Sequence, residues 1–268
     1  MNRAFFGAMF RQQRPKLLKF STGIVLYEGL LTWVYPLISK NSAVTDIVDS
    51  IPSTVKTVFG VSPKARADTF EAFISAQFLA RIWSVIIALY GINTANTLLS
   101  KPIDEGSLVF PLSTPVSRTN ILTTQTAVLL SCNATLIAAT VLGLCVGTFW
   151  FRIRIRYSRY ISLGTLALAF FSLISSYSFL FAAWAKDGEK ASAYAYGLTF
   201  GFYALDVIGG LSKRSAWVGK FSIFRFFKPQ EVLEGTFDPS RAIIGLTAGS
   251  ILLTVITIRI FNESDLPL

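Results

Sequence analysis

Long apolar runs with almost no charge constrain this chain more than any other feature of its sequence. A helix needs roughly 20 consecutive apolar residues to cross the hydrocarbon core of a bilayer. Six segments reach that length, at residues 17–39, 72–99, 120–150, 161–184, 191–211 and 241–260. Backbone groups in lipid must bond within their own segment, so each run is predicted to be a membrane-spanning α-helix. Strands of a membrane barrel would be shorter and would alternate in polarity.

The composition agrees with this class of protein. Only 15% of the 268 residues are charged, whereas a soluble domain carries about 25%. The chain also holds 23 Phe, 9 Tyr and 5 Trp, which so few charged residues could not keep in solution. We therefore expect an all-α, polytopic membrane protein with six spans, forming a single domain over residues 1–268.

The residue inventory restricts the chemistry. There is no histidine, and the two cysteines, Cys132 and Cys145, lie in one apolar run, so we expect no metal site, no disulfide framework and no Ser–His pair. The chain has no G-x-x-x-x-G-K-[ST] stretch, so it is not expected to bind ATP through a P-loop. We attribute the net charge of +10 to residues that meet anionic lipid head groups, because no nucleic-acid recognition motif is present.

Basic residues before the first run set the predicted topology. They are Arg3, Arg11, Arg14, Lys16 and Lys19. This cluster predicts a cytoplasmic N-terminus, and six crossings return the C-terminus to the same side of the cell membrane. The loops at 100–119 and 185–190 would then be cytoplasmic, and those at 40–71, 151–160 and 212–240 would face outward.

Three segments outside the runs are predicted as short helices at the membrane interface, because each places apolar side chains on one helical face. They are residues 2–14 on the cytoplasmic side and residues 44–60 and 217–228 on the outer side. In the last segment the shared face comprises Trp217, Phe221, Phe224 and Phe227. The arginine-rich run at 152–159 is either an outer surface for anionic lipid or cargo, or a solvated span edge.

Three charged residues lie well inside the predicted spans, away from the span ends. Such side chains usually face protein or water. Arg81 and Asp206 are predicted to form an ion pair between the second and fifth spans. Glu28, in the middle of the first span, is a candidate for a polar cargo path or a cation path.

Three spans contain glycines one helical turn apart, which allow helices to approach closely. The pairs are Gly143–Gly147, Gly197–Gly201 and Gly245–Gly249. Each pair serves either packing within one molecule or contact with a second copy. The fifth span is the better candidate for a dimer contact, because Ala193 extends its small face.

A polar segment, SKPIDEGSLVFPLSTPVSR, separates the second and third spans at residues 100–118. Pro102 limits continuation of the preceding helix, and Asp104 and Glu105 suit the N-terminus of a new one. Ser117 can cap the third span. An apolar face is provided by Leu108, Val109 and Leu112. The segment is therefore predicted to form a short cytoplasmic helix between two spans.

At these residues the chain resembles ABC transporter permeases of the class-two exporter superfamily, which have the type V exporter fold. The matching residues are Asp104, Glu105, Gly106, Ser107, Leu108, Leu112, Ser113, Pro115, Ser117 and Arg118. Residues 50–60 and 221–238 resemble the outer segments of that family after its first span and before its last. The six-span layout is similar along nearly the whole chain.

The resemblance implies a transport subunit that is not itself an enzyme. Such a permease would pair with a second copy or a similar permease and bind cytoplasmic ATPase subunits, which would hold ATP and Mg. The short cytoplasmic helix would be the coupling element that docks on the ATPase. The coupling residues implied here are Asp104, Glu105, Gly106, Leu108, Leu112 and Arg118. Aromatic spans and basic outer segments favour an amphipathic or anionic cargo.

Three other classes of function are weighed against this one. A secondary transporter or channel would show inverted repeats or broken helices, and the sequence shows neither. A membrane scaffold or sensor would not need an apolar short helix between two spans. An intramembrane enzyme is the weakest alternative, because the chain lacks histidine and any carboxylate cluster.

Overall fold

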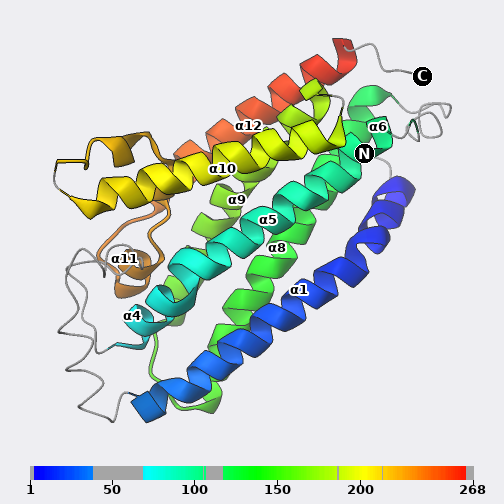
Figure 1. Cartoon of the computed structure of the whole chain (residues 1–268). Helices are drawn as coiled ribbons and strands as arrows, with labels where there is room; N and C mark the ends of the chain where they lie inside the picture. The colour runs from blue at the N-terminus through cyan, green and yellow to red at the C-terminus, as the bar shows by residue number, and fades with distance from the viewer. Residues whose placement is uncertain are drawn as a thin grey trace.

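The computed structural model describes residues 3–38, 69–104, 106, 117–185, 187–212 and 214–263. All regular structure in these ranges is helical, as the all-α prediction requires. The long helices are α1 (Arg3–Ile38), α8 (Arg118–Trp150), α9 (Tyr157–Ala185), α10 (Gly188–Leu211) and α12 (Ser240–Glu263). They run side by side as one elongated bundle (Figure 1).

The second predicted span is one continuous helical stretch over residues 70–104. It consists of α4 (Phe70–Ile74), η1 (Ser75–Trp83), α5 (Ser84–Ala95), η2 (Asn96–Ser100) and α6 (Lys101–Asp104). The segments η1 and η2 are wider π-helical turns. Such turns shift the hydrogen-bond register and are frequent at sites that move or bind.

Within the described residues, five helices are long and apolar enough to cross a membrane, namely α1, the 70–104 stretch, α8, α9 and α12. The sixth predicted span is present as α10, whose 24 residues extend about 36 Å at about 1.5 Å per residue. Three tyrosines, five glycines and Asp206 keep it short of the apolarity that qualifies the other five as spans. The chain is thus a multi-pass membrane protein, and α10 as a sixth span stays a prediction.

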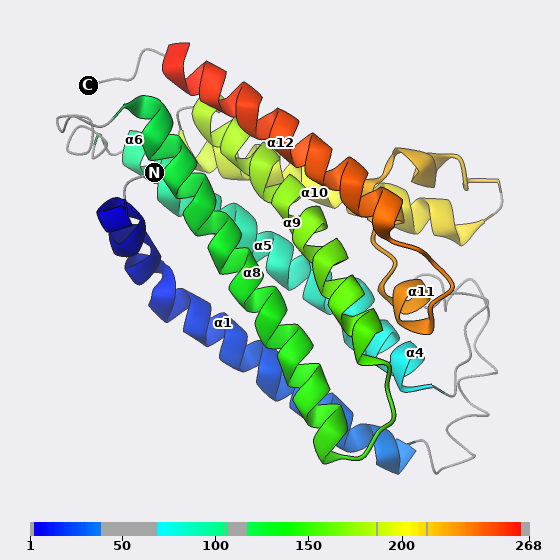
Figure 2. The same ribbon diagram turned by 180° about the vertical axis from the view of Figure 1, so that it is seen from behind.

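α9 is the central helix of the bundle. Its most apolar stretch is 72% buried, against 17% for α12, which lies along its outer side (Figure 2). α9 contacts α5, α8, α10 and α12, whereas α1 packs mainly on α8. The first turn of α1 and the last turn of α12 lie at the same end of the bundle (Figure 1), in keeping with an even number of crossings.

The predicted surface helix at residues 2–14 is not a separate element. Its described residues continue without a break into α1. Its apolar side chains pack partly against the core, and Gln13 is buried. The helix bends in its N-terminal half (Figure 2), which contains Pro15, a residue without a backbone N–H to donate.

The outer segment at 217–228 does not form the predicted amphipathic helix. It folds into two 3₁₀ turns, η3 (Val218–Phe221) and η4 (Ile223–Phe226), before α11 (Pro229–Glu234). Ser222 separates the turns, because its hydroxyl donates to Phe202 O at 2.6 Å and accepts from Phe224 N at 3.1 Å.

The four aromatic residues of this segment therefore do not share a face, and that prediction was wrong. Phe224 and Phe227 are buried, whereas Trp217 and Phe221 are exposed. The other predicted outer helix, at residues 44–60, lies outside the described residues.

Candidate functional site

The predicted coupling stretch begins at a helix end. Asp104 is the last residue of α6, so the 70–104 stretch ends where the sequence predicts a helix end, and the new short helix predicted after it lies outside the described residues. Proline has no backbone N–H, so Pro102 cannot donate to Leu98 O, four residues earlier. Leu98 O instead accepts a hydrogen bond from Gln125 Nε2 of α8, and the helix continues through Pro102. A side chain from the neighbouring span thus replaces the missing backbone donor.

Asp104 lies over the first turn of α10. Its Oδ2 is 3.7 Å from the position that a Cβ would take on Gly188, the first residue of α10. An acidic side chain at the end of its own helix is unfavourable, but the N-terminus of a helix attracts negative charge. The end of the second span therefore packs against the start of α10.

Asp187 caps the same turn. Its Oδ1 accepts from Glu189 N at 2.9 Å and from Lys190 N at 3.0 Å. The backbone N–H of Lys190, followed by the ammonium of the same residue, lowers the pKa of the Asp187 carboxyl. Asp187 thus caps the N-terminus of α10, and the carboxylate of Asp104, from the end of α6, lies beside the same turn.

The coupling stretch ends where α8 starts. Ser117 caps this helix as predicted, and its hydroxyl accepts from Asn120 N at 3.3 Å. Arg118 Nη1 donates to Asn262 O at 3.5 Å, and Asn262 Nδ2 donates to the Thr119 hydroxyl at 3.0 Å. The start of the third span is therefore attached to the end of α12.

We call the end of the bundle that holds Asp104, Asp187, Arg118 and Asn262 the linker end. Gly106 also lies there, with φ +67°, a left-handed conformation that glycine adopts without strain, and its N–H donates to Ile103 O at 3.2 Å. The other implied coupling residues, Glu105, Leu108 and Leu112, lie outside the described residues. The coupling helix itself therefore stays a prediction.

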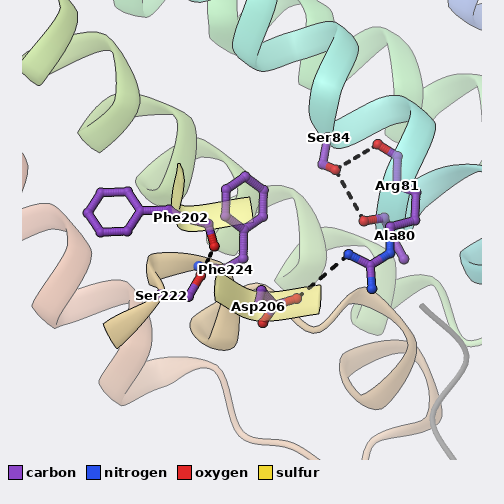
Figure 3. Close-up of polar contacts among 7 residues, drawn as sticks. All are labelled: Ala80, Arg81, Ser84, Phe202, Asp206, Ser222 and Phe224. Carbon is purple, nitrogen blue, oxygen red and sulfur yellow. Dashed lines mark hydrogen bonds and ion pairs between the residues drawn. The ribbon is translucent and has the colours of Figure 1, made fainter. Parts of the chain in front are cut away.

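At the opposite end of the bundle, Arg81 of η1 and Asp206 of α10 form the ion pair that the sequence predicts. Arg81 Nη1 lies 3.7 Å from Asp206 Oδ2 (Figure 3). The guanidinium also lies 5.1 Å from the ring centre of Tyr203. Next to it, the Ser84 hydroxyl lies 3.1 Å from Ala80 O and 2.9 Å from Arg81 O (Figure 3), where η1 gives way to α5. We call this end the cap end.

Glu28 belongs to a different group. Its side chain is fully buried and points at Gly143 of α8, where an added Cβ would lie 2.6 Å from Glu28 Oε2. The adjacent Thr140 accepts a hydrogen bond from Trp83 Nε1 at 2.8 Å. The Thr140 hydroxyl is the hydrogen-bonding group beside the Glu28 carboxylate among the residues that the structure describes. The three charged residues within the spans thus form two groups rather than one path.

The glycine pairs of α8 and α10 differ in what surrounds them. Gly143 and Gly147 pack on α1, the latter beside Thr32, so they serve contacts within the molecule. Gly197 and Gly201 of α10 have no neighbouring atom within 4 Å of an added Cβ, among the residues that the structure describes. Sequence reasoning found Gly143 as a packing residue but missed that it makes room for Glu28, because the sequence does not show the rotation of each helix.

Comparison with known proteins gives one match. No curated protein and no solved structure is significantly similar to the chain. Residues 3–261 match the model of one protein family, and this range covers the long helical stretches up to the last turn of α12. The chain therefore belongs to the family described as the multidrug efflux system permease Rv1217c, C-terminal domain.

Proposed function

We propose that this chain is the membrane-spanning permease subunit of an ATP-driven exporter in the cell membrane, with six spans and both termini in the cytoplasm. The family supports an efflux permease. The resemblance of residues 104–118 to the ABC permease signature supports coupling to an ATPase on another chain, which would hold ATP and Mg.

The observation that carries the proposal is the way the coupling stretch is anchored. Before it, α6 contacts the start of α10 through Asp104 and Gly188. After it, α8 is bonded to the end of α12 through Arg118 and Asn262. A force applied to residues 105–116 would therefore reach four helices at once. A bare loop between two spans would have no such connections.

The 70–104 stretch is suited to transmit this force. It carries two π-helical segments, η1 and η2, at which the backbone hydrogen bonds change register. Movement of its linker end would shift it against α10, whose other end is attached through the Arg81–Asp206 pair. We propose that this shift opens the export path.

We further propose that α10 contacts a second permease copy or a similar permease. Only four of its residues are buried, yet it does not contain a stretch apolar enough to qualify as a clear membrane span. A helix facing lipid should be at least as apolar as its neighbours, so protein or water is the better environment for its exposed face. The open surface at Gly197 and Gly201 would accept a closely packed helix.

For Glu28 we propose a role in a polar path for cargo or cations. A fully buried carboxylate without a basic partner among the described residues is costly in a membrane and is usually kept for function. Replacement by alanine should reduce transport while the thermal stability of the protein is retained. Unchanged transport in Glu28→Ala would remove the proposed path without affecting the coupling proposal.

The coupling proposal is tested by co-purification. The full chain is isolated in detergent from its own cell, and the bound cytoplasmic protein is assayed for ATP hydrolysis. We expect a P-loop ATPase, and we expect Glu105→Arg to abolish both its binding and efflux of amphipathic dyes. Glu234→Arg, the same charge change at the cap end, is the matched control and should retain both. If no ATPase binds, or if Glu105→Arg behaves like the control, the coupling proposal fails.

A further inference from the structure

A cavity of about 600 Å³ lies at the cap end. It is an open cavity lined by η1, by the last turns of α10 and by the segment between α10 and α12. Figure 3 shows three of its lining residues, Arg81, Asp206 and Phe224. Sites for small molecules usually measure about 300–1,000 Å³, so the cavity has the size of a ligand site.

The charged side chains around the cavity are unbalanced. Four are basic and two are acidic, which gives a net charge of +2. Lys228 is neutralised by Glu231, with 3.0 Å between Nζ and Oε1, and Arg81 is paired with Asp206. Lys220 and Arg225 have no ion pair with a described residue. Two positive charges are therefore left for a ligand.

The two cations come from neighbouring positions in the cavity wall. Arg225 Nη1 donates to Lys220 O at 3.3 Å, which places the guanidinium beside the Lys220 backbone. Both side chains are exposed, so they can turn to a bound anion without breaking a buried contact. An arginine and a lysine so placed suit a carboxylate or phosphate group.

The remaining wall is aromatic and rigid. Phe227 stacks on Phe170 of α9 at 4.9 Å between ring centres, and Phe224 meets the same ring edge to face at 5.0 Å. Phe226 is 41% exposed, and its ring centre lies 5.3 Å from the Arg225 guanidinium carbon. An apolar ring next to two unpaired cations fits a ligand with an acidic group on an apolar body.

The backbone holds this wall in place. Gly209 of α10 and Gly219 of η3 cross so closely that a Cβ on Gly209 would lie 2.5 Å from Gly219 Cα. No larger residue fits at that crossing. The cavity therefore exists before any ligand arrives, which lowers the cost of binding.

We propose that this cavity binds an amphipathic anion, with its carboxylate or phosphate at Lys220 and Arg225 and its apolar body against Phe226 and Phe227. The inference goes beyond the proposed function, because it concerns binding by this chain alone, with or without an ATPase. Failure of one proposal therefore leaves the other standing. The anion could be supplied as a free compound or as the head group of a lipid.

The test measures binding of 2-naphthoate to the full chain in phosphatidylcholine nanodiscs by calorimetry, with empty discs subtracted. The double variant Lys220→Gln and Arg225→Gln should weaken binding about tenfold or more, since charge-assisted hydrogen bonds are the stronger class. The double variant Arg154→Gln and Arg156→Gln is the matched control, because it removes two exposed charges outside the cavity. We expect it to bind 2-naphthoate normally.

Two further measurements complete the test. First, Phe226→Ala, at an exposed position, should weaken 2-naphthoate binding without lowering the melting temperature. Second, the cation 2-naphthylmethylammonium should not bind to the unaltered chain. Phosphatidylglycerol in the disc assigns the source: displacement of 2-naphthoate identifies a lipid head group, and unchanged binding identifies a free anion. Equal losses in the two double variants, or equal binding of the cationic probe, would overturn the proposal.

Discussion

The helices α10 and α12 look alike in the sequence and differ in what their exposed faces suit. Each has 24 residues, few buried side chains and a pair of glycines one turn apart. α12 exposes large aliphatic side chains such as Ile251 and Leu252, which suit lipid. α10 carries tyrosines, open glycines and Asp206. Equal exposure in one molecule therefore does not imply the same environment in the membrane.

Substitutions at the glycines are expected to give the largest difference between α10 and α12. Gly197 of α10 and Gly245 of α12 both have open space around an added Cβ, so leucine fits either site in a single molecule. We expect Gly197→Leu to overpack a helix contact between two copies, at about 1–3 kcal/mol, or roughly 5- to 150-fold in the dimer constant. Gly245→Leu should leave dimerisation unchanged. Mass photometry in nanodiscs measures both, and equal behaviour of the two variants would contradict the assignment of α10 to a contact.

The ion pair gives the next largest effect, since Asp206 distinguishes α10 from α12. Asp206→Asn should leave half-buried Arg81 without its counter-charge and lower the free energy of unfolding by about 1–2 kcal/mol. Adding Arg81→Gln should restore part of the loss. Thermal unfolding of the two single variants and the double variant measures the coupling. Strictly additive losses would show that the 3.7 Å pair does not stabilise the attachment of α10 to the second span.

The acidic caps at the starts of α10 and α12 are expected to give the smallest effect. Asp187 at α10 and Asp238 at α12 both accept hydrogen bonds, and the hydroxyl and N–H of Ser240 lower the pKa of the Asp238 carboxyl. Because both pKa values are lowered on folding, this stabilisation is complete above about pH 4 and is lost as the pH falls through the lowered values. Amide hydrogen exchange should show less protection of both first turns at pH 3 than at pH 6.

The loss of amide protection at low pH should differ in size between the two helices. Gly188 in the first turn of α10 is buried beneath α6, whereas Ser240 and Arg241 in the first turn of α12 are exposed. We expect the first turn of α12 to lose more protection. Asp187→Ala and Asp238→Ala should remove the pH dependence at their own helix only. A pH response that persists in both alanine variants would show that other groups control the ends.

Much of the helical architecture was predictable because its cause is local. The six apolar runs became the six long helical stretches, since each run is long enough to satisfy its own backbone hydrogen bonds. The Arg81–Asp206 pair and the Ser117 cap followed from residue type and position. The helix end at Asp104 was also predictable, but the way the helix passes Pro102 was not, because Gln125, 27 residues after Leu98, supplies the hydrogen bond to Leu98 O that Pro102 cannot make.

The errors at the cap end have a similar cause. Spacing alone placed four aromatic residues of the outer segment on one helical face. Ser222 instead bonds to Phe202 O in α10 and breaks the segment into two turns. A short segment has too few internal hydrogen bonds to resist such a contact.

The sequence by itself determined that this protein crosses a membrane as helices, because run length and the lack of charge leave no other way to satisfy the backbone in lipid. Only the tertiary structure decided which side of each helix faces a neighbour. An almost uniformly apolar run carries little information about rotation around its axis, so the burial of Glu28 against Gly143, the open glycines of α10 and the cavity at Lys220 and Arg225 emerge only when the helices are packed together.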